Sequence, residues 1–254
     1  MKAIILAAGR GSRLGSMTDE RPKCLVKLYG SPLLDWQINS LRKGGINEIV
    51  IVTGYKKEFI ESYGLKTITN HEWSASNMVK SLLCAEKEID SEVIVSYSDI
   101  VYEAEIVKSL IEQPGDIVIT YDPNWKELWS KRFEDPLSDA ESFSINDKGL
   151  LMDIGRLVRD YSEIRGQYMG LLKFSKRAMQ WIDEIIIATP GIEYSLDMTK
   201  LLSLLLERGR QIMTLPARGW WCEIDSEADL QVAQSLIQKN KVPQIFEQHT
   251  IVNG

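Results

Sequence analysis

Short apolar runs alternate with segments of helical spacing through the first half of the chain. An apolar run that is buried on both faces is typical of a strand in a parallel sheet, which the intervening helices then cover. The alternation therefore predicts an α/β fold with a mostly parallel, mixed sheet and helices on both faces. The expected strands are Ala3–Leu6, Glu48–Thr53, Val93–Tyr97 and Asp116–Tyr121, and the expected helices are Ser31–Gly45 with Ser31 as N-cap, Asn77–Lys87 and a segment around Ile106–Ile111.

The pattern changes after residue 121. Ser142–Ile145 and Leu150–Ile154 flank Asn146-Asp-Lys-Gly149, which predicts a β-hairpin. We expect residues 122–170 to form a small β-rich insert beside a Rossmann-like main sheet. The elements expected after it are a strand at Gly170–Phe174, helices at Ser175–Ala188 and Asp197–Gly209, a strand at Gln211–Leu215 and a helix at Ser226–Gln238 with Ser226 as N-cap.

A loop of small and basic residues follows the first expected strand. Residues 6–23 read Leu-Ala-Ala-Gly-Arg-Gly-Ser-Arg-Leu-Gly-Ser-Met-Thr-Asp-Glu-Arg-Pro-Lys. Gly9 and Gly11 let the backbone approach a ligand and adopt positive φ, and the exposed N–H groups of such a loop attract anions. Arg13 and Lys23 can neutralise phosphate oxygens. The loop therefore predicts a polyphosphate site.

Spacing separates this loop from two other phosphate-binding motifs. A P-loop needs Gly-Lys-Ser or Gly-Lys-Thr at a fixed distance, which neither glycine has. A dinucleotide-binding Gly-x-Gly-x-x-Gly needs a third glycine where Leu14 stands, and an acidic residue where Val26–Ser31 has none. A dehydrogenase is therefore a distant alternative. For the glycines alone, a strand-to-helix turn with solvated basic residues is the simpler alternative.

The whole string resembles the signature of the sugar-phosphate nucleotidyltransferases, Leu-Ala-Ala-Gly-x-Gly-x-Arg followed by Pro-Lys. The resemblance is strong over residues 1–60, returns at 95–100 and 219–225, and is weaker over 120–215. It is greatest to the phosphocholine cytidylyltransferase-like branch. This implies a CTP-dependent enzyme that joins CMP to a small phosphorylated acceptor and releases pyrophosphate. The matching positions are Leu6, Ala7, Ala8, Gly9, Gly11, Arg13, Pro22 and Lys23.

The resemblance also implies a division of the single domain, residues 1–254. The nucleotide-binding half is 1–121, the acceptor- and metal-binding half is 122–225, and a C-terminal helix and tail occupy 226–254. Arg13 would hold the β- and γ-phosphates, and Lys23 would stabilise charge at the α-phosphate. Asn77 and Ser81 share a helix face and could read the base, although Asn77 equally suits an N-cap. The expected nucleotide-binding residues are Leu6, Ala7, Ala8, Gly9, Arg10, Gly11, Gly54, Tyr55, Asn77 and Ser81.

Three carboxylates are candidates for a Mg²⁺ cofactor, which a nucleoside triphosphate needs to mask its charge. Asp99 follows an apolar strand, where open α/β sheets bind ligands, although it could instead belong to the N-cap region of the helix near Glu103. Glu223 and Asp225 lie two apart in an extended segment, so both should point to one side, where a metal would relieve their repulsion. A solvated acidic edge is the alternative. The resemblance favours the metal, because Trp221, Glu223 and Asp225 match a Trp-x-Glu-x-Asp pattern of phosphocholine cytidylyltransferases.

Aromatic residues gather in the less regular part of the chain and suggest where the acceptor binds. An aromatic cage would suit a quaternary ammonium, although scattered aromatic residues more often pack in a core. The acceptor could be phosphocholine, an aminophosphonate, or a phosphorylated amino acid or amide such as phosphoglutamine. The expected acceptor-side residues are Tyr102, Trp125, Tyr168 and Trp220, with Trp129 in the same cluster.

The charge and the cysteine content limit the kinds of molecule that the chain is expected to bind and the compartment in which it is expected to work. The net charge of −6 argues against a nucleic-acid partner, whereas residues 1–27 hold six basic and two acidic residues and suit a small anion. Three widely spaced cysteines form no disulfide framework, and no secretory segment or apolar run of about 18 residues is present. We therefore expect a cytoplasmic protein with no membrane partner; a homo-oligomer is compatible with the sequence.

The sequence is also compatible with two other functions. One is a sugar-1-phosphate nucleotidylyltransferase that uses UTP or dTTP, because the residues themselves do not fix which base is read. The other is a non-catalytic, nucleotide-binding regulator that has kept the fold. The presence of Arg13, Lys23, Asp99, Glu223 and Asp225 speaks against the regulator.

Overall fold

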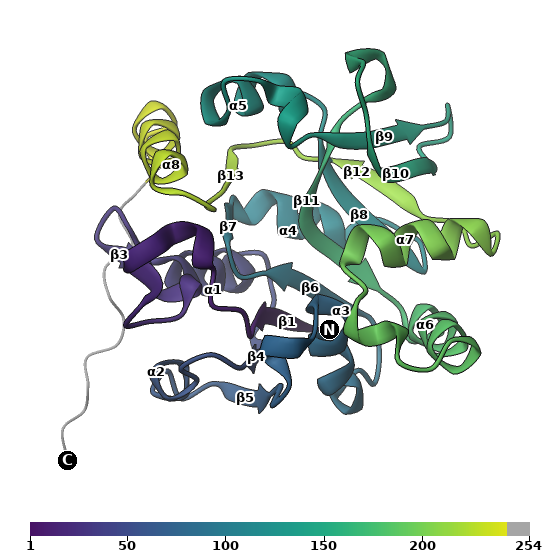
Figure 1. Ribbon diagram of the computed structural model, residues 1–254, viewed down its shortest axis with the longest axis horizontal. Coiled ribbons are helices and arrows are strands. Elements are labelled where there is room, and N and C mark those ends of the chain that lie inside the picture. The colour runs from purple at the N-terminus through teal and green to yellow at the C-terminus, as the bar shows by residue number, and fades with distance from the viewer. Residues whose placement is uncertain (243–254) are drawn as a thin grey trace.

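The computed structural model describes residues 1–242, and a seven-stranded sheet lies at its centre (Figure 1). Strand β11 runs antiparallel to both of its neighbours, and every other pairing in this sheet is parallel. The predicted α/β fold with a mostly parallel, mixed sheet is confirmed. In spatial order the strands are β12 (Met213–Pro216), β8 (Ile117–Asp122), β11 (Gln167–Phe174), β6 (Val93–Tyr97), β1 (Lys2–Ala7), β4 (Glu48–Thr53) and β5 (Lys66–Thr69).

Helices cover both faces of the sheet because its strands are apolar on both sides. Along β1, Ala3 and Ile5 pack into one core, and Ile4 and Leu6 into the other. The first core contains residues of α1 (Leu33–Lys43), α4 (Ala104–Glu112) and α8 (Glu227–Lys239), and the second those of α3 (Met78–Cys84), α6 (Lys176–Ala188) and α7 (Met198–Glu207).

The predicted hairpin is confirmed and forms part of the insert. Strands β9 (Glu141–Ile145) and β10 (Leu151–Leu157) pair antiparallel, with irregular register. Helix α5 (Trp125–Arg132) precedes them, and Figure 1 shows α5 and the hairpin at the same end of the molecule. The insert thus lies over one end of the main sheet.

A second short ladder, which the sequence did not predict, joins distant parts of the chain. Strand β7 (Ile100–Tyr102) pairs antiparallel with β13 (Trp221–Glu223), so that Glu223 lies opposite Ile100. The ladder continues for one more bond, because the Ile224 N–H donates to the Asp99 carbonyl at 2.8 Å. It therefore brings residue 99 beside residues 223–225.

Some predicted boundaries are wrong. Ser31 does not cap α1: Ser31–Pro32 form β3, which pairs with β2 (Lys27–Leu28), and the helix begins at Leu33 after an extended Pro32. The helix expected to reach residue 87 ends at Cys84. The prediction of Ser226 as the N-cap of α8 is confirmed, and Asp229 completes a capping box.

The remaining elements are short. Helix α2 (Glu58–Glu61) lies between β4 and β5 in the sequence, and 3₁₀ turns occupy Ser12–Thr18, Lys23–Leu25, Trp73–Ala75, Glu86–Glu88, Pro136–Ser138, Tyr161–Glu163 and Ile192–Tyr194. Among residues 1–242, no helix has both the length and the apolar character needed to cross a bilayer. Residues 243–254 of the expected C-terminal tail lie outside the described part of the chain.

Candidate active site

The loop after β1 is shaped around the side chain of Lys23. Gly11 has φ +75°, and a Cβ there would lie 2.6 Å from the Cβ and Cδ atoms of Lys23. Glycine therefore supplies both the left-handed conformation and the space in which the lysine passes. The expectation of positive φ is confirmed for Gly11 and wrong for Gly9.

The Lys23 ammonium lies between two of the candidate metal ligands. Its Nζ is 2.7 Å from Asp99 Oδ2 and also contacts Asp225 Oδ1, and the lysine side chain is only 9% exposed. Burial alone would lower the pKa of Lys23, but the carboxylates of Asp99 and Asp225 outweigh it and raise this pKa above its usual value. Lys23 is therefore a charged group held inside an acidic site.

The three candidate metal ligands come together as the sequence predicts. One carboxylate oxygen each of Asp99, Glu223 and Asp225 lies within 4.8 Å of the others. Cys222 and Ile224 are fully buried, as expected for the opposite side of an extended segment. The pairing of β7 with β13 brings the three ligands together. We call Asp99, Glu223 and Asp225 the carboxylate triad.

The triad has the donor chemistry of a cation site. Burial, followed by the charge of Asp225, raises the pKa of Glu223 to about 8, although Arg132 opposes this rise. Hard carboxylate oxygens are ligands that Mg²⁺ prefers, and a bound cation would stabilise the charged form of all three groups. The residues present therefore fit a divalent metal.

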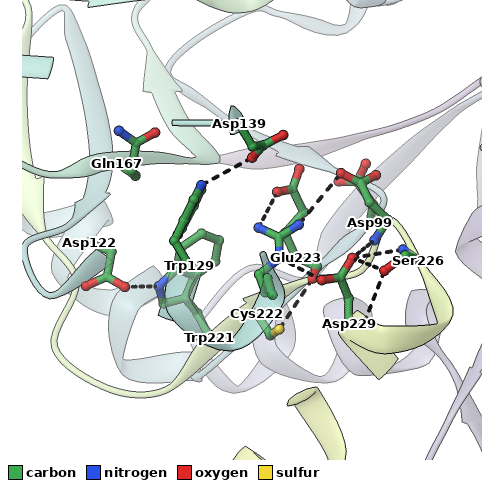
Figure 2. Close-up of polar contacts among 12 residues, drawn as sticks. Asp99, Asp122, Trp129, Asp139, Gln167, Trp221, Cys222, Glu223, Ser226 and Asp229 are labelled. Atoms are coloured by element: carbon green, nitrogen blue, oxygen red, sulfur yellow. Dashed lines mark hydrogen bonds and ion pairs between the residues drawn. The ribbon is translucent and has the colours of Figure 1, made fainter. Parts of the chain in front are cut away.

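Arg132 and Asp229 belong to the same polar cluster and were missed at the sequence level. Arg132 Nε is 2.8 Å from Asp229 Oδ1, and its Nη1 is 2.9 Å from Glu223 Oε2. Figure 2 shows Asp229 and Ser226 joined at the start of α8, beside Glu223. The Ser226-x-x-Asp229 spacing could have revealed the capping role of Asp229. No local pattern marks Arg132.

A cavity of about 240 Å³, which we call the loop cavity, opens beside the first loop. Most of the expected nucleotide-binding residues line it, together with both expected catalytic residues. Trp73, Met78 and Tyr97 also line it and were not predicted. The predicted residues in its wall are Leu6, Ala8, Gly9, Gly11, Arg13, Lys23, Asn77, Ser81 and Asp99.

The other expected nucleotide-binding residues lie around the loop cavity rather than in its wall. Ala7 is buried in the core on the other face of the sheet, and Arg10 pairs with Asp19 at 2.6 Å. The Tyr55 N–H donates to the Ala8 carbonyl at 2.9 Å, and a Cβ on Gly54 would meet that carbonyl at 2.6 Å. Gly54 and Tyr55 thus support the loop from behind.

Asn77 and Ser81 have structural partners as well as positions in the loop cavity. The Asn77 side chain accepts from the Met78 N–H at 2.8 Å and so caps α3. The Ser81 hydroxyl accepts from Asn70 Nδ2 at 3.0 Å, which leaves its own O–H able to donate. Asp99, in contrast, does not cap α4, whose N-cap is Glu103.

A second cavity of about 270 Å³ lies between the main sheet and the insert, and we call it the insert cavity. Arg13, Met78 and Tyr97 line both cavities, and Glu223 and Asp225 also line the second. The triad and Arg13 therefore stand where the two cavities meet. The other polar and aromatic residues that line the insert cavity include Trp129, Asp139, Glu141, Gln167, Tyr168, Asp197 and Trp221.

Only one of the four expected acceptor-side residues, Tyr168, lines the insert cavity. Tyr102 is 1% exposed and donates its hydroxyl to Ser96 Oγ at 3.0 Å. Trp125 is buried against Trp129 and Tyr161, and Trp220 packs on Trp36. All three residues are buried in the core, and none of them lines the insert cavity.

Trp129 and Trp221 are the tryptophans that line the insert cavity, and Figure 2 shows each of them bonded to a carboxylate. Trp129 Nε1 donates to Asp139 Oδ2 at 3.2 Å, and Trp221 Nε1 donates to Asp122 Oδ2 at 2.9 Å. Both indoles are therefore fixed in orientation by a carboxylate. Trp129 belongs to the aromatic cluster noted in the sequence, whereas Trp221 was noted only as part of the metal motif.

Comparison with known proteins shows similarity to enzymes that transfer nucleotides. The model of the MobA-like NTP transferase domain matches residues 3–188. The chain is 36% identical to CTP:phosphoglutamine cytidylyltransferase of Campylobacter jejuni over 91% of this chain and 98% of that one. It is also 37% identical to choline-phosphate cytidylyltransferase of Streptococcus pneumoniae, over 41% of this chain and 47% of that one.

Solved structures share the fold at lower identity. The inositol-1-phosphate CTP transferase from T. maritima superposes with a TM-score of 0.77 at 20% identity, covering 96% of this chain and 98% of that one. The CTP:phosphocholine cytidylyltransferase from Streptococcus pneumoniae gives 0.68 at 22% identity, with 93% and 98% covered. The matched domain and the fold together show that this chain belongs to the MobA-like NTP transferase family.

Proposed function

We propose that the chain is a CTP-dependent cytidylyltransferase that joins CMP to a small phosphorylated acceptor and releases pyrophosphate. One observation carries this proposal: Arg13, Lys23 and the carboxylate triad meet at the junction of two cavities. Two substrates bound in adjacent cavities would place their reacting phosphates at that junction. The relatives named for CTP and phosphorylated acceptors support the same assignment.

The loop cavity would hold CTP. Arg13, whose side chain is 67% exposed, can turn toward the β- and γ-phosphates and the departing pyrophosphate. Lys23 would stabilise the charge that develops at the α-phosphate. Asn77 and Ser81 would face the pyrimidine, where Ser81 can donate a hydrogen bond to a base acceptor. The assignment of CTP rather than UTP rests on the relatives.

The carboxylate triad would hold Mg²⁺. The metal, when bound, would mask phosphate charge and orient the α-phosphate for attack. Asp99, Glu223 and Asp225 are the residues that would ligate it, because their oxygens already converge. Lys23 and Arg13, which pair with Asp225 in this structure, would then be free to contact phosphates.

The insert cavity would hold the acceptor. A phosphate oxygen of the acceptor would attack the α-phosphorus in line, and no general base is needed because that oxygen is already an anion. Asp139, Glu141 and Asp197 line the cavity beside aromatic rings. Carboxylates and aromatic faces suit an acceptor whose other end is cationic or rich in N–H donors, such as phosphoglutamine or phosphocholine.

A screen of pyrophosphate release tests the proposal. Each of the four common nucleoside triphosphates would be combined with Mg²⁺ and with phosphoglutamine, phosphocholine, 2-aminoethylphosphonate or a set of sugar 1-phosphates. We expect release with CTP and a nitrogen-bearing acceptor. Release with UTP or dTTP and a sugar 1-phosphate would instead identify a sugar nucleotidylyltransferase. Nucleotide binding without release for any acceptor would identify a regulator.

A further inference from the structure

Two kinds of cation contact the carboxylate triad. Lys23 and Arg13 also line the loop cavity, so both can leave the carboxylates for phosphates. Arg132 lines neither cavity, and its side chain is 0% exposed. Arg132 therefore has no route to a substrate, and its effect on the site must act through the residues that it contacts.

We infer that Arg132 is a positioning residue, which fixes Glu223 and Asp225 in the geometry that a metal requires. This inference rests on the proposed function. The guanidinium is a rigid planar fork, and each of its nitrogens faces a different acidic residue. Nε is 2.8 Å from Asp229 and Nη1 is 2.9 Å from Glu223, and both donate hydrogen bonds, whereas Nη2 lies 3.8 Å from Asp225 and has no hydrogen-bond partner among the described residues.

Asp229 ties this fork to the backbone that carries the metal ligands. Its Oδ1 accepts from Arg132, while its Oδ2 accepts from the N–H groups of Asp225 and Ser226 at 3.0 and 2.8 Å. The capping box at Ser226 holds Asp229 at the start of α8. Arg132 and Asp229 together therefore clamp residues 223–226, and neither of them lines the loop cavity or the insert cavity.

The charge of the surrounding carboxylates also favours a cation at position 132. The triad and Asp229 place four carboxylates in one cluster. In the proposed reaction Lys23 and Arg13 turn to phosphates, whereas Arg132 stays. A buried carboxylate left without a partner is costly, so a cation that stays in contact with the ligands stabilises their arrangement.

Helix α5 also connects this clamp to the insert cavity. Trp129, one turn before Arg132, lines that cavity, and the Arg132 guanidinium lies 5.1 Å from the centre of its ring. Asp139 holds the Trp129 indole from the other side. A shift of Arg132 should therefore disturb the acceptor wall as well as the metal ligands.

The test separates position from charge. Arg132→Lys keeps the charge and loses the fork, and Asp229→Asn keeps the shape and weakens the clamp. Residues that hydrogen-bond to the ligands of a metal typically contribute about 10–100-fold to metal affinity or activity. We expect Arg132→Lys to weaken Mn²⁺ binding, measured by electron paramagnetic resonance without nucleotide, by about 10-fold or more. Asp229→Asn should weaken it in the same direction, and the two changes should not add.

Kinetics give a second readout. Since Arg132 does not line the loop cavity, kcat should fall in Arg132→Lys while the KM for CTP changes little. Arg156→Lys, at an exposed arginine that pairs with Asp153 at 2.7 Å, is the matched control and should be neutral. Mn²⁺ affinity and kcat within twofold of the unmodified chain in a folded Arg132→Lys would overturn the inference. If that variant does not fold, unchanged Mn²⁺ affinity in Asp229→Asn would overturn it.

The two proposals fail differently. If the unmodified chain binds Mn²⁺ and no acceptor gives pyrophosphate, the proposed function fails while the Mn²⁺ comparison still decides the role of Arg132. If pyrophosphate is released and the variants bind Mn²⁺ normally, the function stands and the positioning role is wrong.

Discussion

Replacing Lys23 with methionine gives the sharpest thermodynamic test of the carboxylate triad as a cation site. The change removes an ammonium that is 9% exposed and leaves Asp99 without its 2.7 Å partner. Removing one member of a buried ion pair costs about 3–5 kcal/mol. Asp225 keeps Arg13 at 3.0 Å and Arg132 at 3.8 Å, so the lower end, about 3 kcal/mol, applies. For a chain of this size that corresponds to a fall in Tm of about 6–12 °C.

Divalent metal should reverse much of this loss. In the unmodified chain the metal must displace the Lys23 ammonium, whereas in Lys23→Met the carboxylates are already free of it. Metal at about 100 times its Kd stabilises the folded state by about 2.7 kcal/mol, or about 5–10 °C here. Thermal unfolding, recorded by circular dichroism in EDTA and across a Mg²⁺ titration, measures both effects. The Mg²⁺-induced rise in Tm should be larger in the variant.

Lys108→Met is the matched control, because Lys108 pairs with Glu105 at 2.9 Å on the surface and such pairs contribute about 0–1 kcal/mol. A Lys23→Met protein with the unmodified Tm in EDTA would refute the reasoning. So would a Mg²⁺-induced rise equal to that of the unmodified chain. Pyrophosphate release should separately fall by about 10²–10³-fold, as for loss of one transition-state donor.

Three further predictions follow from single features of the site. Gly11→Ala and Gly149→Ala both strain a left-handed position and should both lower Tm, Gly11→Ala by more because its Cβ also meets Lys23, and only Gly11→Ala should slow pyrophosphate release. Because burial and the charge of Asp225 raise the pKa of Glu223, Mg²⁺ binding near neutral pH should release protons and metal affinity should rise with pH; calorimetry in buffers of different ionisation enthalpy measures this. Asp197→Asn should raise the KM for a cationic acceptor and leave the KM for CTP unchanged.

Each of these has a clear contrary result. Equal rates of pyrophosphate release in the two glycine variants would show that Gly11 does not act through Lys23. Metal affinity that is independent of pH around neutrality would show that the pKa of Glu223 is not raised in the metal-free site. An unchanged acceptor KM in Asp197→Asn would show that the insert cavity does not bind the cationic end of the acceptor.

The parts of the site that depend on local sequence were predictable. The loop after β1 combines backbone freedom with basic side chains within a few residues, and Glu223 and Asp225 share a side because a strand has a period of two. Six of the expected loop-cavity residues belong to this one segment: Leu6, Ala8, Gly9, Gly11, Arg13 and Lys23. These are the features that a short segment encodes without reference to the rest of the chain.

The parts that depend on distant pairing were not predictable. The three ligands were proposed together, but the ladder that brings them together was not: it pairs β7 with β13, two three-residue strands more than a hundred positions apart, and no local pattern marks that pairing. Arg132 meets Glu223 and Asp229 across 91 and 97 positions. The prediction of acceptor-side aromatic residues was mostly wrong for a related reason. Nothing in the local sequence distinguishes Tyr102, which packs in the core, from Trp129, which lines the insert cavity, because that difference depends on the tertiary structure. Ser31 was mispredicted as a cap since pairing with β2 competes for it.

The central claim is that the α-phosphoryl group of CTP moves, with its nucleoside, to an acceptor phosphate. Incubation with Mg²⁺, CTP carrying ³²P at either the α- or the γ-position, and each acceptor of the pyrophosphate-release panel in turn, phosphoglutamine first, tests it directly. We predict that the α-label appears in the acceptor adduct and the γ-label in pyrophosphate. A γ-label in the acceptor, or no transfer of either label to any acceptor of the panel, would contradict the account.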